Sequence, residues 1–317
     1  MDHMRLAVLS NERLSSSTHW SALRRPLLEP LASHPGGQLV SPPELAISQL
    51  REWRATFGQV RRADALFWMQ MSARPETALS FASIARPLAQ RSTVVIDAWR
   101  PSLPKIAALA IAQRMRPCFV FMREGCEELT RRYPRGTFEW IPFGVDTEVF
   151  QSRGEERDIF AYWMGRRYEP LHEALVAYCR ERDLEYRFTV GGEITDPVEL
   201  GRMVARSRYF VVTPPDLDNP ERTGGFSPLV MRYFEGLSAG ARLLGVRPRS
   251  GEFEDLLPDD SILDVAPDGS DLAERLDADR DDPLIGEAVE RACALVRAEH
   301  SWGRRAEQLY EGMLAHR

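Results

Sequence analysis

Short apolar runs alternate with helix-like segments along the first half of the chain. The pattern predicts strands at 4–10, 65–69, 93–97, 118–122 and 138–141. It predicts helices at 79–90, 105–116 and 124–133. A further helix over 20–32 should be broken or short, because Pro26 and Pro30 fall inside it. Strands that are apolar throughout and alternate with helices are typical of a parallel α/β sheet of Rossmann type.

The same alternation begins again after a polar stretch at 151–158, which is predicted to be a linker. Strands are expected at 159–164, 186–190, 209–213 and 241–246. Helices are expected at 171–182, from 197, at 228–239, 271–276, 284–298 and 302–316. Asp196 and Ser227 each precede a proline, a combination typical of a helix N-terminus. The pattern therefore predicts two Rossmann-like α/β domains facing across a cleft, at 1–150 and 151–300, followed by a helix at 301–317.

Composition limits the kinds of protein that fit this pattern. Of the 317 residues, 44% are hydrophobic and 28% are charged, which is typical of a globular protein. The net charge of −6 argues against a non-specific nucleic-acid binder. Lys105 is the one lysine among 41 basic residues, so a bound anion would be held by arginines, backbone N–H groups or hydroxyls.

No apolar run approaches the length of a membrane-spanning helix, and a cytoplasmic protein is expected. Peripheral association with the inner face of a membrane stays open, because a lipid-linked substrate requires no spanning helix. The four cysteines form no C-x-x-C pair, which favours buried or incidental thiols over a metal or redox site.

The segment 224–245 carries the most informative chemistry. A glycine-rich turn leads through Ser227 and Pro228 into a predicted helix, whose N-terminus would suit a phosphate. Glu235 follows Pro228 by seven residues and would lie on the same helix face two turns later. Its carboxylate could accept hydrogen bonds from two ribose hydroxyls while the helix start holds a diphosphate. The alternative is a solvated Glu235 that pairs with Arg232, three residues before it.

Together with 141–150 (IPFGVDTEVF), this segment resembles the retaining glycosyltransferases of the GT-B fold, in the family 4 type. The form RYFEGLSAGA is similar to the divergent spore-maturation-protein-like branch, in which an arginine precedes the Phe-Glu pair, as Arg232 does. The segment 300–314 resembles the family's final helix, which returns to the first domain. The resemblance implies a hexosyltransferase that acts with retention and uses a nucleoside diphosphate sugar of the UDP or GDP type. It implies no metal and no further cofactor.

The resemblance also implies roles for residues of the second domain. Glu235 matches the second glutamate of the family's Glu-x7-Glu motif, which binds ribose. The first glutamate falls on Ser227, which either contacts the sugar or only caps the helix, so the sugar's identity does not carry over. Gly165 and Arg166 match residues directed at the diphosphate, and Arg167 is the candidate to replace a missing lysine. The expected donor-binding residues are Gly165, Arg166, Arg167, Gly191, Gly192, Thr213, Gly225, Phe226, Ser227, Pro228, Leu229, Arg232 and Glu235.

The acceptor is expected in the first domain. Asp97 stands at the carboxyl end of a predicted strand, where α/β sheets place ligands, although it could simply cap a loop. Asp97, Arg166 and Glu235 are the catalytic candidates. The acceptor-binding candidates are Asn11, His19, Asp97, Trp99, Arg100 and Arg123. The family's histidine near Asp97 is missing, which fits front-face attack, in which the leaving phosphate oxygen helps to deprotonate the acceptor.

Two acidic segments of the sequence, and the fold itself, also allow other interpretations. Asp216 and Asp218 have the spacing of a metal-binding pair in another transferase fold, which the rest of the chain does not fit. The acidic run 277–282 reads as a solvated loop. Competing functions are a GT-B epimerase or phosphorylase, or a non-catalytic sugar-nucleotide-binding partner subunit. Expected partners are the donor and a glycan, lipid-linked or small-molecule acceptor. No nucleic acid is expected, and the oligomeric state is open.

Overall fold

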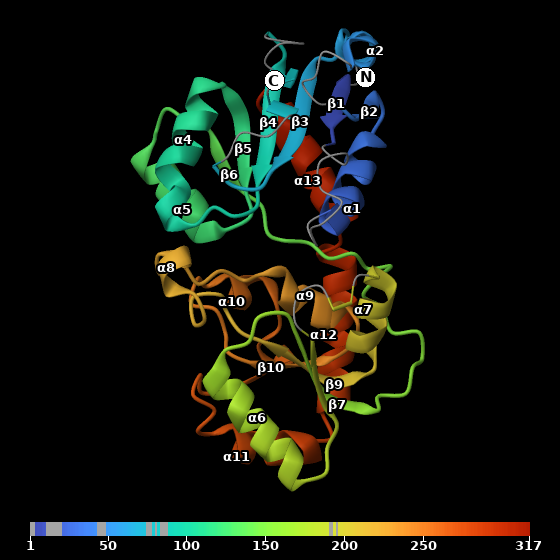
Figure 1. The fold of residues 1–317 in the computed structure, drawn as a ribbon, viewed down its shortest axis with the longest axis vertical. Helices are drawn as coiled ribbons and strands as arrows, with labels where there is room; N and C mark the ends of the chain where they lie inside the picture. The colour runs from blue at the N-terminus through green and yellow to red at the C-terminus, as the bar shows by residue number, and fades with distance from the viewer. Residues whose placement is uncertain are drawn as a thin grey trace. The chain divides into compact units, whose positions relative to one another are not determined.

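A computed structural model describes residues 4–10, 21–42, 49–73, 78–79, 81–82, 88–189, 193–194 and 196–317. Its contacts divide the chain into two units, each built around one parallel sheet (Figure 1). The first unit comprises Met1–Pro142 and Trp302–Arg317, and the second comprises Phe143–Ser301. None of the helices in the described ranges is long and apolar enough to cross a bilayer.

The sheet of the first unit has the strand order β2-β1-β3-β4-β5-β6, with every pair parallel. Its strands are β1 (Leu6–Leu9), β2 (Gly37–Val40), β3 (Ala65–Gln70), β4 (Gln90–Val95), β5 (Met115–Val120) and β6 (Phe138–Trp140). All residues of β1 and β3 are buried, as expected for strands covered on both faces.

The helices of the first unit are α1 (Ser21–Ala32), α2 (Leu50–Val60), α4 (Leu103–Ala112), α5 (Arg123–Arg132) and α13 (Trp302–Ala315), with a 3₁₀ turn η3 (Arg100–Ser102). Helix α13, the last of the chain, packs beside α1 (Figure 1). The rings of His34 and Tyr310 stack there at 4.3 Å. The final helix thus returns to the first unit, as the family resemblance implied.

The second sheet has the order β11-β10-β9-β7-β8 and is also parallel throughout. Its strands are β7 (Ile159–Met164), β8 (Tyr186–Thr189), β9 (Ser207–Val212), β10 (Arg242–Gly245) and β11 (Ile262–Asp264). The helices are α6 (Glu169–Glu181), α7 (Pro197–Ala205), α8 (Pro220–Thr223), α9 (Met231–Ser238), α10 (Glu252–Leu256), α11 (Leu272–Asp281) and α12 (Ile285–Glu299), with a 3₁₀ turn η4 (Asp259–Ser261).

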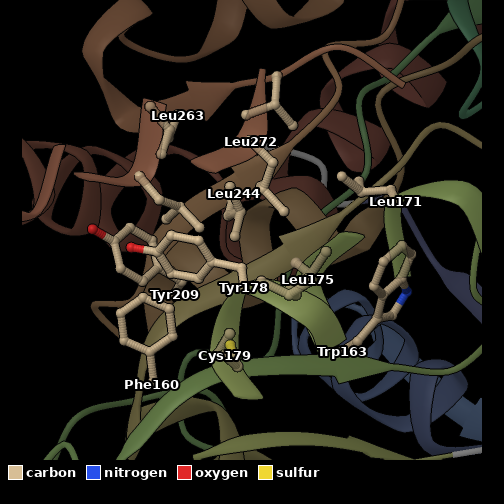
Figure 2. Packing of buried hydrophobic residues seen from close by; sticks show 14 residues of the cluster. Phe160, Trp163, Leu171, Leu175, Tyr178, Cys179, Tyr209, Leu244, Leu263 and Leu272 are labelled. Atoms are coloured by element: carbon tan, nitrogen blue, oxygen red, sulfur yellow. The ribbon is translucent and has the colours of Figure 1, made fainter. Parts of the chain in front are cut away.

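A cluster of buried apolar side chains joins this sheet to helices α6 and α11 (Figure 2). Leu171 and Leu175 enter it from α6, and Leu272 enters it from α11. Burying side chains of this size contributes roughly 1.5–3 kcal/mol each. The hydroxyl of Tyr178 donates to Asp277 at 2.8 Å, which satisfies a polar group at the margin of the cluster.

The prediction of a solvated loop at 277–282 is wrong, because α11 continues to Asp281. Asp279 is buried and accepts a hydrogen bond from Arg242 at 2.7 Å and from the Tyr209 hydroxyl at 3.0 Å. These donors come from β9 and β10, so they were not apparent from the local acidic composition.

Other expected elements also differ from the structure. Helix α1 runs through Pro26 and Pro30 without a break. The helix expected over 79–90 lies partly outside the described residues, and its last position begins β4. The chain passes Pro117 inside β5 instead of starting the strand after it. A register shift opposite 91–93 leaves this proline outside the regular ladder, where its missing N–H costs nothing.

Candidate functional site

The carboxyl edge of the second sheet brings together the ends of β7 and β8 with helix α9. Gly165 follows β7 with φ of +92°, and its N–H donates to the Thr189 carbonyl at 2.8 Å. A Cβ at Gly165 would lie 3.3 Å from Nη2 of Arg232. The backbone conformation therefore favours glycine, and a side chain here would also press against the end of the Arg232 side chain.

Glu235 lies on α9, one turn from Arg232, with Oε2 3.5 Å from Nη1 of the arginine. The glutamate side chain is 12% exposed and that of the arginine 40%. Burial raises the pKa of Glu235, and the Arg232 charge opposes that shift. The pair expected from the sequence is present, but its carboxylate is buried instead of solvated. An ionised carboxylate has room for several donors, so this one can also accept from ligand hydroxyls.

The two arginines after β7 border an open pocket of about 250 Å³. Nε of Arg166 lies 3.6 Å from Asp218. The guanidinium of Arg167 lies 4.1 Å above the Phe188 ring. Its Nη1 is buried and has no hydrogen-bond partner among the described residues. A buried donor of this kind calls for an acceptor, which an anionic ligand in the pocket would supply. The pocket is lined by Gly165, Arg166, Arg167, Glu169 and Asp218.

Residues 226–230, just before α9, are not helical, so the prediction of a helix starting at Ser227 and Pro228 is wrong. Helix α9 begins at Met231. Oγ of Ser227 accepts from the Arg249 N–H at 3.2 Å instead of capping a helix. Local residue preferences favoured the helix start, and long-range hydrogen bonds override them.

Glu252 is the residue of this region that sequence reasoning missed. It is 1% exposed, and its Oε2 accepts from the Leu229 N–H at 2.8 Å and from the Ser250 hydroxyl at 2.7 Å. The Leu229 N–H is thus already bonded to a carboxylate within the chain. The sequence signal was weak, because acidic residues are ordinary in the first turn of a helix such as α10.

The remaining donor-side candidates are placed as follows. Gly225 has φ of +86° and donates to Oγ1 of Thr223 at 3.3 Å. Phe226 and Pro228 are buried, and Thr213 follows β9 half-buried. Gly191 and Gly192 lie outside the described residues, as do the acceptor candidates Asn11 and His19.

Asp216 and Asp218 each face an arginine. Oδ2 of Asp216 lies 2.7 Å from Nη2 of Arg249, and Asp218 approaches Arg166. Within the described ranges, no three His, Cys, Asp or Glu side chains gather as metal ligands. The two aspartates serve as partners of arginines.

In the first unit, Asp97 follows β4 at the carboxyl edge of the sheet, and its N–H donates to the Met71 carbonyl at 2.8 Å. Arg100 pairs with Glu128 at 3.2 Å, and the Arg123 guanidinium lies 4.2 Å over the Trp140 ring. The Trp99 side chain is mostly buried. Asp97 is thus at the expected edge, while both arginines have partners inside the unit.

Comparisons with known proteins concern the family and the fold of the chain. A family described as glycosyl transferase-like matches residues 166–311, a stretch that includes most of the candidate donor site. No curated protein matches the chain in sequence.

Solved structures share the fold at low sequence identity. HepE of Anabaena, in complex with UDP and glucose, superposes with a TM-score of 0.58 at 10% identity and covers 99% of this chain and 100% of its own. A trehalose-6-phosphate synthase gives 0.57 at 12% identity, covering 98% and 99%. AviGT4, a glycosyltransferase involved in avilamycin A biosynthesis, gives 0.53 at 13%, covering 99% and 98%. The chain therefore has the two-domain GT-B fold of glycosyltransferases.

Proposed function

We propose that the protein is a glycosyltransferase that moves a sugar from a nucleoside diphosphate donor, of the UDP or GDP type, to an acceptor. The observation that carries the proposal is the carboxyl edge of the second sheet. There neighbouring elements provide the buried Glu235 carboxylate and the Nη1 of Arg167, which has no hydrogen-bond partner among the described residues. The glycosyl transferase-like match over 166–311 supports it.

The charge of each residue determines which part of the donor it would bind. The Glu235 carboxylate accepts from the ribose hydroxyls. Arg166 and Arg167 neutralise the diphosphate as it leaves, which lowers the barrier to transfer without a metal ion. The Leu229 N–H already donates a hydrogen bond to Glu252. We therefore assign diphosphate binding to the arginines and not to the segment 227–229. On the basis of the family resemblance, we further propose that the transfer retains the configuration of the sugar and that the protein is of the family 4 type.

Asp97 is the catalytic candidate on the acceptor side, because it lies at the carboxyl edge of the first sheet. The acceptor class that we propose is a glycan, a lipid-linked saccharide or a small molecule. HepE was crystallised with UDP and glucose, which makes UDP-glucose the first donor to test.

A thermal-shift screen with UDP, GDP, ADP and dTDP tests nucleotide binding. A ligand at 100 times its dissociation constant stabilises the folded state by about 2.7 kcal/mol. Arg167→Gln should abolish the shift, whereas Arg180→Gln, an exposed position on α6, should preserve it. If none of the four nucleotides shifts the transition, the proposal is wrong.

Turnover separates this function from the alternatives. A transferase releases free nucleoside diphosphate when an acceptor is added. An epimerase converts the donor with no acceptor present. A non-catalytic partner subunit binds the donor without any turnover, and either of these outcomes would overturn the proposal.

A further inference from the structure

The two units carry opposite net charge. Residues 1–142 and 302–317 contain 22 basic and 14 acidic side chains, whereas residues 143–301 contain 19 basic and 33 acidic side chains. The overall charge of −6 therefore conceals a basic first unit. An asymmetry of this kind points to a partner for the basic part.

The positive charge collects where the strands of the first sheet begin. All pairs are parallel, so the amino ends of the strands share one edge of the sheet. We name as the basic edge five exposed arginines that lie before β3, at the start of β5 and before β6. These are Arg61, Arg62, Arg114, Arg116 and Arg135.

Hydrogen bonds connect the parts of this edge. The Gln90 N–H, at the start of β4, donates to the Asp64 carbonyl at 3.1 Å, just before β3. The Gln90 side chain donates to the Arg116 carbonyl at 2.9 Å. From β3 to β6 the edge spans three strand spacings, or roughly 15 Å.

Two acidic side chains near this edge are engaged elsewhere. Asp64 pairs with Arg5 at 2.6 Å and with Arg317 at 3.8 Å, and Glu139 pairs with His316. In the part of the chain that the structure describes, no ion pair involves an arginine of the basic edge. Within the described residues of the first unit, their charge is thus left unneutralised.

The second unit shows that arginine richness alone does not produce such an edge. Many of its arginines face a carboxylate. Examples are Arg182 with Asp277, Arg206 with Asp158, Arg242 with Asp279 and Arg291 with Asp260. In the first unit, burial and the nearby Arg114 charge lower the pKa of Arg91. Positive groups at this edge therefore repel one another, and an anion would relieve the repulsion.

Exposed leucines accompany the arginines. Leu88, two residues before β4, is 96% exposed. Leu314 on α13 is 40% exposed and follows Met313, whose carbonyl accepts from Gln90 at 2.9 Å. Cationic side chains that adjoin exposed apolar ones match the headgroup region of an anionic membrane, which offers both negative charge and an apolar boundary.

We propose that the basic edge binds the surface of an anionic lipid bilayer. The arginines contact lipid phosphates, while Leu88 and Leu314 enter the boundary between headgroups and acyl chains. The carboxyl edge with Asp97 lies at the other end of strands about 20 Å long, so bilayer binding leaves it open. This inference does not depend on the proposed transfer reaction.

Sedimentation of the full-length protein with lipid vesicles tests the proposal. Vesicles of phosphatidylcholine with phosphatidylglycerol should carry the protein down, and pure phosphatidylcholine should not. Sodium chloride at 0.5 M, about three times the physiological ionic strength, should release it, because salt screens exposed charges. The variant Arg61→Gln/Arg62→Gln/Arg114→Gln/Arg116→Gln should partition roughly 600-fold more weakly, at about fivefold per arginine.

The matched control removes four charges from exposed positions of the second unit. It is Arg180→Gln/Arg187→Gln/Arg202→Gln/Arg291→Gln, and its binding to vesicles should be unchanged. Circular dichroism of both variants verifies that they fold, and Leu88→Ser should weaken binding by itself.

Three results would overturn the proposal. One is that the wild-type protein does not sediment with anionic vesicles at low salt. Another is that the control variant loses as much binding as the basic-edge variant. The last is salt-sensitive self-association that requires the same arginines. In that case the basic edge would bind the acidic second unit of another copy of the protein instead of a bilayer.

Discussion

Glu235 is a carboxylate whose burial opposes its ionisation. Because burial raises its pKa above the ordinary 4.5, the folded state holds this proton more tightly than the unfolded state does. Its contribution to the free energy of unfolding therefore falls as the pH rises from 4.5 through the raised pKa. A buried charge that costs stability is typical of a group kept for binding.

Glu235→Gln should raise the free energy of unfolding at pH 7 and remove that decline with pH. The same variant should bind nucleotide roughly 10- to 100-fold more weakly, because it loses hydrogen bonds to a charged acceptor. Urea unfolding between pH 4.5 and 7 measures the first effect, and titration calorimetry the second. Glu290→Gln, exposed on α12, is the control, and an equal effect there would contradict the assignment.

Glu252→Ala should destabilise the protein by about 1–3 kcal/mol, because it leaves the buried Leu229 N–H without an acceptor. Glu252→Gln keeps an oxygen in that place and should cost less. Urea unfolding measures both variants beside Glu254→Ala, an exposed residue of the same helix. If Glu254→Ala destabilised the protein as much, the effect would belong to helix α10 in general.

The family resemblance assigned Gly165 and Glu235 to one donor site, because the short motifs that carry it can be recognised locally in the sequence. Sequence reasoning missed Glu252 because the hydrogen bond to Leu229 joins residues 23 positions apart. This bond depends on the position of the chain after β10. Sequence reasoning also treated Ser227 as a helix cap, whereas the Arg249 N–H binds that hydroxyl. Long-range hydrogen bonds account for both errors.

At the scale of elements, helix α11 is joined to β10 by an ion pair between Arg242 and Asp279. Both side chains are less than a tenth exposed. The pair between Arg291 and Asp260, in contrast, is more than half exposed on both sides. The two pairs allow the effect of burial to be measured within one unit.

Asp279→Ala should lower the free energy of unfolding by about 3–5 kcal/mol, because it leaves the buried Arg242 guanidinium without its carboxylate partner. Asp260→Ala should change the free energy of unfolding by less than about 1 kcal/mol. Chemical denaturation of the two variants gives the comparison. Arg242→Met combined with Asp279→Leu should recover most of the loss, and equal costs for the two single variants would refute this account.

Element prediction succeeded where the signal was short-range and distinct. Asp196 caps α7, where its Oδ1 accepts from the Val198 N–H at 3.0 Å, as its sequence indicated. Strand β7 has the predicted bounds. Strand β2 was missed because its four residues are mixed in polarity. Helix α2 was missed because charged residues and Gly58 interrupt its apolar face.

At the scale of the whole molecule, the described donor-site candidates all belong to the second unit, while β1 to β6 belong to the first. Sequence alone predicted two α/β domains, and the parallel sheets and solved GT-B structures confirm that fold. The return of α13 was implied by the resemblance. Periodicity alone could not show it, because a helix pattern does not reveal which sheet the helix covers.

Saturating nucleotide should slow amide hydrogen exchange around 165–189 and 225–238 and leave β1 to β6 unchanged. Local opening of these segments has to break their contacts with the nucleotide. With nucleotide at 100 times its dissociation constant, the free energy of opening should therefore rise by about 2.7 kcal/mol. Peptide-resolved mass spectrometry measures it, and Arg167→Gln should abolish the effect. Protection confined to the first unit would contradict the placement of the donor.

The return of α13 has a consequence for the order in which the chain is made. The strands β1 to β6 are synthesised first, but Trp302, Leu309 and Met313, which are buried in the folded protein, emerge only after the whole second unit. At about 5–20 residues per second, the intervening segment takes roughly 8–30 s to synthesise. The unit that starts earlier therefore finishes later. During nascent-chain folding, the face that α13 will cover stays exposed until α13 itself has been synthesised.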